Sequence, residues 1–358
     1  MIQSRIIVED ERMKYPFTGL FTFCEQLSKS LVKNKSQLNG NLSFYVPKNQ
    51  VGFAGDQIGY HIQQSWHKFF NPIHAKADLW HGTYQGSRYF PSGKKIKKIL
   101  TIHDLNFLVE QKKSEAKQKK LLDKVRRQVE QADHVTAISQ FTLDFIKQHI
   151  DFTNKPVDVI YNGCHVDTET DVPSKPKFIQ DDKPFLFSIG TIAEKKNFHV
   201  LVPLLKGNDF NLIVAGIYQQ DSYVEKIKAE AKKHGVSDRV ILPGSVTTAE
   251  KWWLMQNSEA FVFPSIAEGF GIPVVEAMYF EKPILLSTHT CLPEIGGDAV
   301  YYFTDFEPEN MQRKLQQAMH DFYNSSEKKV LMRDRKLKFN WDHAAMRYID
   351  IYNKTLGQ

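Results

Sequence analysis

Two glutamates on either side of a glycine-containing loop are the strongest sign of chemistry in the sequence. Glu268 precedes Gly269 and Gly271, and Glu276 lies about one turn inside the helix predicted to follow. Carboxylates accept hydrogen bonds from the vicinal hydroxyls of a sugar, and glycines let the backbone approach a ligand closely. Acids near a helix start also favour the helix dipole, so a purely structural role is the alternative. The pattern predicts a site for ribose or hexose rings.

Two lysines precede another predicted helix, at 198–205. Lys195 and Lys196 follow Gly190, which ends a predicted strand at 185–189. Positive charges beside the free N–H groups of a helix start favour a phosphate, and a diphosphate fits best. Taken alone, paired lysines are also typical of a solvated surface. Together with the glutamate loop, they predict a diphosphate subsite.

Two histidines lie at the ends of predicted strands in the first half of the chain. His103 follows 99–102 and precedes Asp104, which could orient the imidazole or set a turn, and His81 follows 79–80. A lone histidine is usually structural, but the end of a parallel strand favours contact with a ligand. The sequence has no H-E-x-x-H, D-x-D, P-loop or G-x-G-x-x-G motif. We therefore expect no metal site, and the NTPase and dehydrogenase classes are disfavoured.

Short apolar runs alternate with helix-period stretches along the chain, which is typical of parallel sheets covered on both faces. We expect strands at 6–8, 42–46, 79–80, 99–102, 135–138, 157–161, 185–189, 212–215, 240–242, 260–263 and 284–286. We expect helices at 20–31, 121–129, 140–149, 198–205, 223–234, 252–255 and 274–280. The candidate residues follow several of these strands, where parallel sheets bind their ligands.

Length and composition favour a folded protein of two domains. The chain has 358 residues, with 42% hydrophobic and 25% charged residues, which excludes a disordered or disulfide-scaffold class. Three widely separated cysteines argue against a zinc site and fit a reducing compartment. The net charge of +6 is too diffuse to indicate nucleic acid. A polar, proline-bearing stretch at 166–182 predicts a linker between the domains.

On these motifs, the chain resembles retaining glycosyltransferases of the GT-B fold, family 4 (group 1), a class with many bacterial mannosyl- and glucosyltransferases. The similarity runs from TGLFTFCEQL, which begins at Thr18, through TIHDLNFL, VIYNG and FSIGTIAEKKN to PSIAEGFGIPVVEAM. It implies an α/β protein of two Rossmann-like, doubly wound domains that face a cleft. Residues 1–165 would bind the acceptor, with a terminal helix at 340–358 packing back on them, and residues 183–339 would bind the donor.

Within the donor domain, the resemblance implies one extended set of contacts. Glu268 and the amides of Phe270 and Gly271 would hold the donor sugar. Glu276 would hold the ribose. The full implied donor set is Gly190, Lys195, Lys196, Val246, Glu268, Gly269, Phe270, Gly271 and Glu276.

The resemblance also implies roles at the two ends of the donor. Lys196 would face the diphosphate, and Val246 would face the edge of the base. Gly19 would lie in the loop near acceptor and phosphate, and His103 beside the transferred sugar. The implied catalytic residues are His103, Glu268 and Lys196, and the further candidates are His81 and Asp104.

The phosphate segment departs from the family pattern at two positions. Many relatives carry arginine directly after the glycine and again before the lysine, where this chain has Thr191 and Lys195. Lysine is a point charge without the bidentate geometry of arginine. The charge clamp is therefore weaker here, or completed elsewhere.

The implied activity is transfer of a hexosyl group, of mannose or glucose type, from a GDP- or UDP-linked sugar to a hydroxyl. The acceptor would be a growing glycan or a lipid-linked saccharide, and the configuration would be retained without a metal. Two alternatives stay open, because a fold does not fix a function. One is a nucleotide-sugar epimerase or hydrolase, and the other is a non-catalytic donor-binding partner in a glycosylation complex.

Two basic tracts, 94–98 and 112–127, indicate an anionic partner for the first half of the chain. The second tract carries an apolar stripe of Leu121, Leu122, Val125 and Val129, which suggests peripheral contact with an anionic membrane. A core-packed helix with a solvated basic face is the alternative. N-terminal charges argue against a signal peptide, and no run approaches the roughly 20 apolar residues of a membrane span. We expect a cytoplasmic protein, with the inner face of the membrane as its hypothetical partner.

Overall fold

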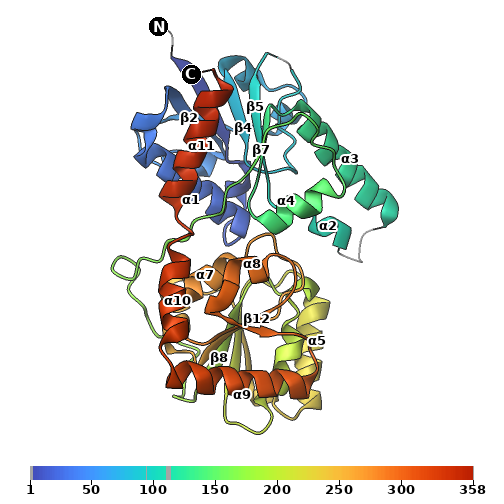
Figure 1. The fold of residues 1–358 in the computed structure, drawn as a ribbon, viewed down its shortest axis with the longest axis vertical. Helices are drawn as coiled ribbons and strands as arrows, with labels where there is room; N and C mark the ends of the chain where they lie inside the picture. The colour runs from blue at the N-terminus through green and yellow to red at the C-terminus, as the bar shows by residue number, and fades with distance from the viewer. Residues whose placement is uncertain (1–2, 94, 110–113, 358) are drawn as a thin grey trace. The chain divides into compact units, whose positions relative to one another are not determined.

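The structure is a computed structural model that describes residues 3–93, 95–109 and 114–357. The chain forms two compact units (Figure 1). The first comprises Met1–Gly163 and Phe339–Gln358, and the second comprises Cys164–Lys338. The expected linker at 166–182 contains no helix or strand and belongs to the second unit, where the Ser174 amide donates to the Ala249 carbonyl at 3.1 Å.

In the described part of the first unit, seven parallel strands form a sheet in the order β3-β2-β1-β4-β5-β6-β7. The strands are β1 (Ser4–Glu9), β2 (Gly40–Val46), β3 (Gly59–Ile62), β4 (Leu79–Gly82), β5 (Lys97–Ile102), β6 (His134–Ala137) and β7 (Val157–Val159). The helices are α1 (Gly19–Lys33), α2 (Asn106–Val109), α3 (Glu115–Gln131), α4 (Gln140–Lys147) and α11 (Trp341–Thr355).

The second unit has its own parallel sheet, in the order β10-β9-β8-β11-β12-β13. The strands are β8 (Phe185–Ile189), β9 (Asn211–Ala215), β10 (Val240–Gly244), β11 (Ala260–Phe263), β12 (Ile284–Ser287) and β13 (Tyr301–Phe303). The helices are α5 (Asp221–Lys233), α6 (Thr248–Asn257), α7 (Ile272–Met278), α8 (Leu292–Gly296), α9 (Pro308–Asn324) and α10 (Glu327–Lys336). Both sheets are doubly wound, so the predicted pair of Rossmann-like α/β domains is confirmed.

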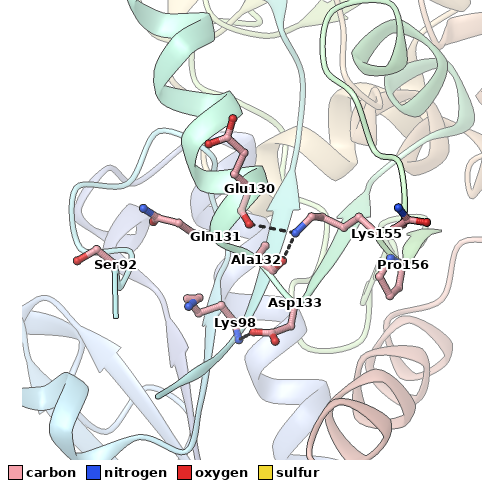
Figure 2. Close-up of a pocket in the computed structure, with 9 residues that line it drawn as sticks. Ser92, Lys98, Glu130, Gln131, Ala132, Asp133, Lys155 and Pro156 are labelled. Carbon is pink, nitrogen blue, oxygen red and sulfur yellow. Dashed lines mark hydrogen bonds between the residues drawn. The ribbon is translucent and has the colours of Figure 1, made fainter. Parts of the chain in front are cut away.

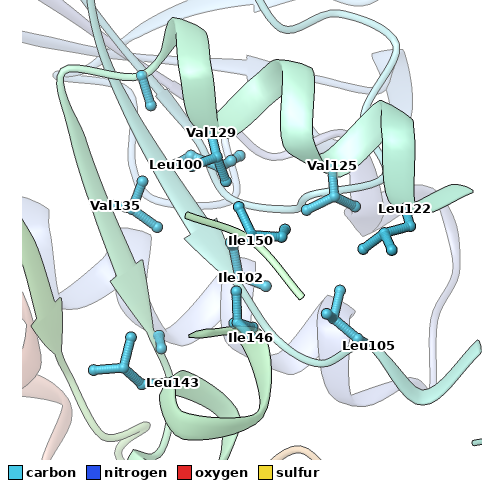
Figure 3. Packing of buried hydrophobic residues seen from close by; sticks show 12 residues of the cluster. Leu100, Ile102, Leu105, Leu122, Val125, Val129, Val135, Leu143, Ile146 and Ile150 are labelled. Carbon is cyan, nitrogen blue, oxygen red and sulfur yellow. The ribbon is translucent and has the colours of Figure 1, made fainter. Parts of the chain in front are cut away.

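Helix α3 packs its apolar side into the core of the first unit (Figure 3). Leu122, Val125 and Val129 are buried with Leu100 and Ile102 of β5. The prediction that this stripe faces a membrane is therefore wrong, because its side chains already cover the sheet. Lys117 and Lys120 of the same helix are exposed, whereas residues 94, 112 and 113 of the two basic tracts lie outside the described residues.

The expected elements differ from the observed ones where the apolar pattern is weak. Strand β3 was not predicted, because GYHI contains no apolar run and lies half-buried at the edge of the sheet. The helix expected at 198–205 is a 3-10 helix, η7 (Phe198–Leu205), and Pro203 within it cannot donate a backbone hydrogen bond. Asn197 before it has a φ of 58° and makes no side-chain cap.

Helix α11 completes the first unit and lies beside α1 (Figure 1). The Tyr352 hydroxyl bonds to His81 Nδ1 at 2.7 Å, and the Tyr348 hydroxyl lies 3.0 Å from the Thr101 hydroxyl. All four side chains are buried. A Cβ on Gly163 would come within 2.2 Å of the Trp341 amide nitrogen, so only glycine lets the chain pass there.

Removing the Tyr352 hydroxyl should destabilise the first unit, because His81 Nδ1 would then be buried without a partner. We expect Tyr352→Phe to lower the free energy of unfolding by about 1–3 kcal/mol. Urea unfolding followed by circular dichroism measures this, with Tyr323→Phe on the exposed face of α9 as the matched control. Equal stability of the two variants would show that the buried hydrogen bond contributes nothing.

Candidate functional site

The second sheet reverses its strand order between β8 and β11, and ligands of doubly wound sheets bind beyond the carboxyl ends of such strands. Gly190 directly follows β8, and the loop that carries Glu268 follows β11. Lys196 ends a short 3-10 helix, η6 (Glu194–Lys196), in the segment after β8. The residues predicted to bind the sugar and the diphosphate therefore lie beyond the carboxyl ends of β8 and β11. This is the switch point of the second sheet, where the strand order reverses.

Lys196 and Glu268 form an ion pair in this segment. The Lys196 ammonium donates to Glu268 Oε1 at 2.5 Å, and it lies 5.0 Å from the ring centroid of Phe263. The two side chains are only 11% and 13% exposed, so water screens the pair weakly. The structure thus brings two of the three predicted catalytic residues together.

Glycines make room for this pair. Gly190 has a φ of 155°, and a Cβ there would come within 3.2 Å of Lys196 Cε. A Cβ on Gly216, which follows β9, would lie 1.9 Å from the Gly190 carbonyl oxygen. Both positions have a positive φ that favours glycine, and Gly216 lets its strand end approach the Gly190 backbone beside Lys196.

The glutamate loop is held by its own backbone and by a neighbouring loop. Gly271 has a φ of 92° and precedes α7, and the Glu268 amide donates to Thr290 Oγ1 at 3.1 Å. Thr290 itself has a φ of 55°, an uncommon conformation for a side chain branched at Cβ. Phe270 is buried, so its side chain anchors the loop while its amide belongs to the predicted sugar contacts.

Glu276 has a partner that the sequence did not reveal. Lys251 of α6 donates to Glu276 Oε1 at 2.7 Å, and the ammonium lies 4.1 Å from the ring centroid of Trp252. Both side chains are mostly buried. Lys251 and Glu276 are 25 residues apart in the sequence, so no local spacing pattern predicts that they pair.

The loop predicted to meet the base is anchored by a helix cap. Val246 is half-buried in the short connection between β10 and α6. The Thr247 side chain accepts from the Glu250 amide at 3.2 Å, and the Glu250 carboxylate accepts from the Thr247 amide at 2.8 Å. This capping box fixes the start of α6 and with it the position of Lys251, one turn further on. The T-x-x-E pattern was the available sequence signal for this helix start.

His103 is buried at the carboxyl end of β5 in the first unit. Its Nε2 bonds to the Thr83 carbonyl at 2.8 Å, and its amide donates to Gln85 Oε1 at 3.1 Å. Burial lowers the pKa of His103 to about 4, so the ring is neutral at pH 7. A carbonyl can only accept, so Nε2 carries the proton and Nδ1 keeps a lone pair. The ring can therefore accept one hydrogen bond from a ligand.

The other candidates of the first unit have different surroundings. His81 is fully buried, and both ring nitrogens are bonded, to Tyr352 and Thr101, which leaves neither for a ligand. Asp104 Oδ1 accepts from the Asn106 amide at 2.9 Å, which sets the turn after β5. The Thr83 carbonyl orients the His103 ring through its hydrogen bond with Nε2. Gly19 begins α1, and a Cβ there would meet nothing within 4 Å.

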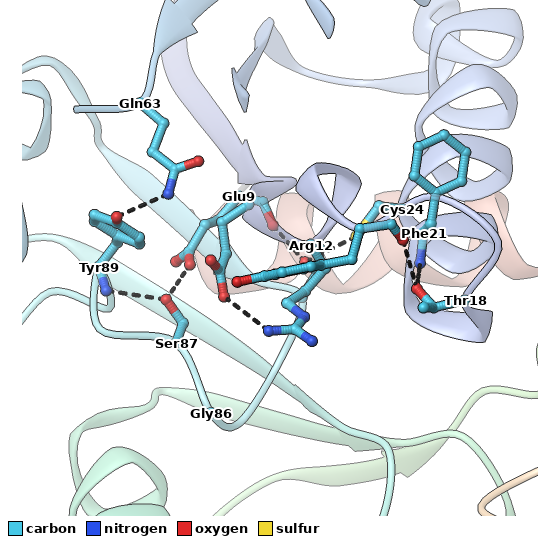
Figure 4. A network of polar contacts seen from close by, with 12 residues as sticks. Glu9, Arg12, Thr18, Phe21, Cys24, Gln63, Gly86, Ser87 and Tyr89 are labelled. Atoms are coloured by element: carbon cyan, nitrogen blue, oxygen red, sulfur yellow. Dashed lines mark hydrogen bonds and ion pairs between the residues drawn. The ribbon is translucent and has the colours of Figure 1, made fainter. Parts of the chain in front are cut away.

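A buried acid network lies beyond the carboxyl end of β1 (Figure 4). Glu9 accepts from the Trp80 indole N–H at 2.8 Å and from the Ser87 hydroxyl. Asp10 accepts from the Ser28 hydroxyl at 2.7 Å. Burial raises the pKa of Glu9 and that of Asp10 to about 8. Glu9 ties the loop that carries Ser87 to the sheet, and Asp10 ties α1 to it. The sequence did not single out either acid.

A hollow of the first unit lies away from these residues. It measures about 530 Å³ and is lined by the segments that enter β5, β6 and β7 (Figure 2). Its Lys155 donates to the carbonyls of Glu130 and Ala132 at the end of α3. None of the predicted site residues lines it, because they lie at the opposite, carboxyl edge of the strands.

The sequence matches two family models in succession. Residues 57–168 match the model described as Glycosyltransferase Family 4, and residues 170–332 match Glycosyl transferases group 1. The chain belongs to the family 4, group 1 glycosyltransferases. The motif TIHDLNFL lies inside the first match and PSIAEGFGIPVVEAM inside the second, so the family predicted from these motifs is confirmed.

Curated relatives of this glycosyltransferase include two proteins of Escherichia coli. The serotype-specific mannosyltransferase WbdA is 26% identical over an alignment of 245 positions that covers 63% of this chain and 29% of WbdA. The O-antigen chain mannosyltransferase B is 21% identical over an alignment of 393 positions that covers 97% of this chain and 99% of that protein. The chain therefore spans less than a third of the length of WbdA.

Solved structures share the fold of this glycosyltransferase. Sucrose-phosphate synthase from Thermosynechococcus elongatus has a TM-score of 0.76 at 17% identity, over 99% of this chain and 100% of that one. Anabaena Alr3699/HepE, solved in complex with UDP and glucose, has a TM-score of 0.73 at 16% identity, over 98% of this chain and 100% of that one. At these identities the similarity concerns the fold alone, which is the predicted GT-B fold.

Proposed function

We propose that this chain transfers a hexosyl group, of mannose or glucose type, from a GDP- or UDP-linked sugar to a hydroxyl of a growing glycan or lipid-linked saccharide. The observation that carries the proposal is the buried Lys196–Glu268 pair at the switch point of the second sheet. A lysine and a carboxylate in contact match the two ends of a sugar diphosphate. The Lys196 ammonium would contact the diphosphate anion, and the Glu268 carboxylate would accept hydrogen bonds from the sugar hydroxyls.

A second observation extends the site toward the nucleoside. The Lys251–Glu276 pair lies between α6 and α7, and α6 starts directly after the loop that carries Val246. In the proposal, Val246 meets the edge of the base and Glu276 accepts from the ribose hydroxyls. Lys251 holds the Glu276 carboxylate in place before the nucleotide binds.

The relatives support the same class of reaction. WbdA and mannosyltransferase B are named as mannosyltransferases, and HepE was solved in complex with UDP and glucose. These names favour a nucleotide sugar as donor and a polysaccharide as acceptor.

The proposed reaction retains configuration and uses fixed charge. The acceptor hydroxyl attacks from the face that the diphosphate leaves, and a donor phosphate oxygen takes the hydroxyl proton. Lys196 stabilises the negative charge that develops on the departing diphosphate. In the first unit, the neutral His103 ring offers Nδ1 as a hydrogen-bond acceptor for a sugar hydroxyl.

Mass spectrometry of the full chain with a panel of nucleotide sugars tests the proposal. Incubation with GDP- and UDP-linked hexoses and saccharide acceptors should yield an acceptor heavier by one hexose, and NMR of its anomeric proton reports the configuration. Free hexose without a lengthened acceptor would favour a hydrolase, and an epimerised donor would favour an epimerase. Donor binding without turnover across the panel would favour the non-catalytic alternative.

We expect transfer to be independent of divalent cations. Within residues 3–93, 95–109 and 114–357, no group of three or more His, Cys, Asp or Glu side chains could hold a metal ion. The reason for the expectation is the Lys196 ammonium, which already supplies positive charge at the proposed diphosphate subsite. EDTA should leave the initial rate of sugar transfer unchanged. Loss of the rate in EDTA and its recovery with manganese would contradict the proposal.

A further inference from the structure

Arg12 of the first unit carries a guanidinium group that the chain leaves without hydrogen bonds. It belongs to a 3-10 helix, η1 (Glu11–Lys14), which follows β1, and its side chain is 25% exposed. Its Nε is buried without a partner, and Nη1 lies 3.9 Å from Glu11 Oε1, too far for a hydrogen bond. Within the part of the chain that the structure describes, the guanidinium donates no hydrogen bond. A mostly buried group with five N–H donors normally has partners, so its unused donors indicate a ligand.

Two tyrosine rings hold this guanidinium between two segments of the first unit. Arg12 Cζ lies 4.7 Å from the ring centroid of Tyr15, which directly follows η1, and 4.7 Å from that of Tyr84, in the loop after β4. Such contacts attract the cation to the faces of the rings, but they do not replace the hydrogen bonds of its N–H groups. The rings therefore fix the position of the guanidinium and leave its donors unused.

Both segments are anchored to the body of the first unit. Met13 of η1 is buried in the core. In the loop after β4, the Gly86 carbonyl accepts from the Lys124 ammonium at 2.6 Å, and the Ser87 hydroxyl donates to Glu9 (Figure 4). The guanidinium is thus held in place before any ligand binds, which lowers the entropy cost of binding.

Arg12 lies close to His103. The Tyr84 ring that contacts Arg12 also has its centroid 6.5 Å from that of the His103 ring. Burial lowers the pKa of His103, and the positive charge of Arg12 acts in the same direction, so the two groups are within electrostatic reach. Both residues follow parallel strands, at the sheet edge where ligands bind. A ligand whose hydroxyl meets His103 can therefore present a second group to Arg12.

The surroundings of Arg12 are positively charged although three acids lie nearby. Burial raises the pKa of Glu9 and that of Asp10 to about 8, so both are mostly protonated at pH 7. Burial also raises the pKa of Glu11, and four neighbouring cations act in the opposite direction. These cations are Arg12, Lys14, Lys68 and Lys124. One carboxylate among four cations leaves an excess of positive charge for a ligand to neutralise.

We propose that Arg12 binds an oxyanion of the acceptor, so that the acceptor is a saccharide with a carboxylate or a phosphate near its reacting hydroxyl. A guanidinium offers paired, coplanar N–H donors that match two oxygens of either anion. A neutral hydroxyl would leave the positive charge uncompensated. The inference rests on the proposed function, in which His103 accepts from a sugar hydroxyl, and it adds the chemical class of the acceptor.

Binding of matched saccharide pairs to the full chain tests the inference without a donor. The pairs are methyl glucuronide with methyl glucoside, for the carboxylate, and glucose 6-phosphate with glucose, for the phosphate. In NMR titrations, the wild type should bind the anionic member of at least one pair more tightly than the neutral member. R12Q should lower that affinity by about 10- to 100-fold and leave the affinity for the neutral member unchanged. The pair that responds identifies the anion.

Two further variants test whether charge and geometry both matter. R12K keeps the charge without the paired donors, so it should retain part of the preference for the anion. R5Q is the matched control, because Arg5 lies near the amino end of β1 in an exposed pair with Asp78 at 2.9 Å. It should bind every probe as the wild type does.

Either of two results would overturn the inference. One is a wild type that binds both members of each pair equally. The other is an R12Q variant that weakens anionic and neutral members alike, which would assign Arg12 to the packing of its two tyrosines. Failure of the proposed function has a different readout, the absence of hexose transfer to any acceptor, and these binding measurements do not depend on transfer.

Discussion

Glu268→Gln should lower kcat for sugar transfer by about 100-fold, which corresponds to about 2.7 kcal/mol of lost transition-state stabilisation. Glu268 lies beside the transferred sugar in the proposed site, where charge develops as the glycosidic bond breaks. Its contact should therefore strengthen toward the transition state. The Lys196 ammonium now bound to Glu268 would be released, so the affinity for a nucleoside diphosphate should stay the same or rise slightly.

Steady-state kinetics together with calorimetric binding of GDP or UDP separates these two effects. Glu225→Gln is the matched control, because Glu225 pairs with Lys228 at 2.8 Å on the exposed face of α5. The control should leave kcat and binding unchanged. Loss of nucleotide binding in Glu268→Gln, with kcat at saturating donor intact, would assign Glu268 to the nucleotide instead of the sugar.

Glu276→Gln should raise the donor KM by about 10- to 100-fold and change kcat much less. The ribose does not change during the reaction, so its contact is nearly equal in the ground and transition states. Lys251→Met should act in the same direction, because an unpaired, mostly buried Glu276 carboxylate is no longer held in place. Lys228→Met removes a lysine from an exposed pair and should have no effect.

The split between KM and kcat decides whether Lys251 positions the ribose carboxylate. A variant that merely destabilised the fold would lower the active fraction, and with it kcat, at constant KM. If Lys251→Met lowers kcat by more than it raises the donor KM, then Lys251 does not act through Glu276. The same measurement on Glu276→Gln shows whether both residues belong to one contact.

The sequence predicted the parts of the fold that depend on local pattern. Strand β5, KKILTI, contains the buried and mostly apolar stretch ILTI, and strand β9, NLIVA, contains the apolar run LIVA, because both faces of the sheet are covered. Strand β3 lies at the sheet edge and is half-buried, so its GYHI sequence carries no such run. The apolar period of residues 198–205 predicts an α-helix, but Pro203 lacks the backbone N–H that such a helix needs, and the segment is a 3-10 helix.

The sequence predicted which glycines and charged residues belong to the candidate site, but it did not predict which charged residues pair with each other. Glu268, Glu276 and Lys196 were found from their place after strands, whereas Lys251 meets Glu276 only through the packing of α6 on α7. His81 and His103 have similar local sequences at strand ends. Tertiary contacts distinguish them, because Thr101 of the neighbouring strand and the distant Tyr352 occupy both ring nitrogens of His81.

The return of α11 to the first unit also bears on how the protein is made. A ribosome completes all of Cys164–Lys338 before it synthesises Tyr348 and Tyr352, which fill the first sheet's remaining buried positions. During that interval the face of α1 that α11 will cover is exposed, and the His81 nitrogen that Tyr352 will occupy is open to water. The first unit can therefore be completed only after the whole of the second has been synthesised, so the second unit can fold first.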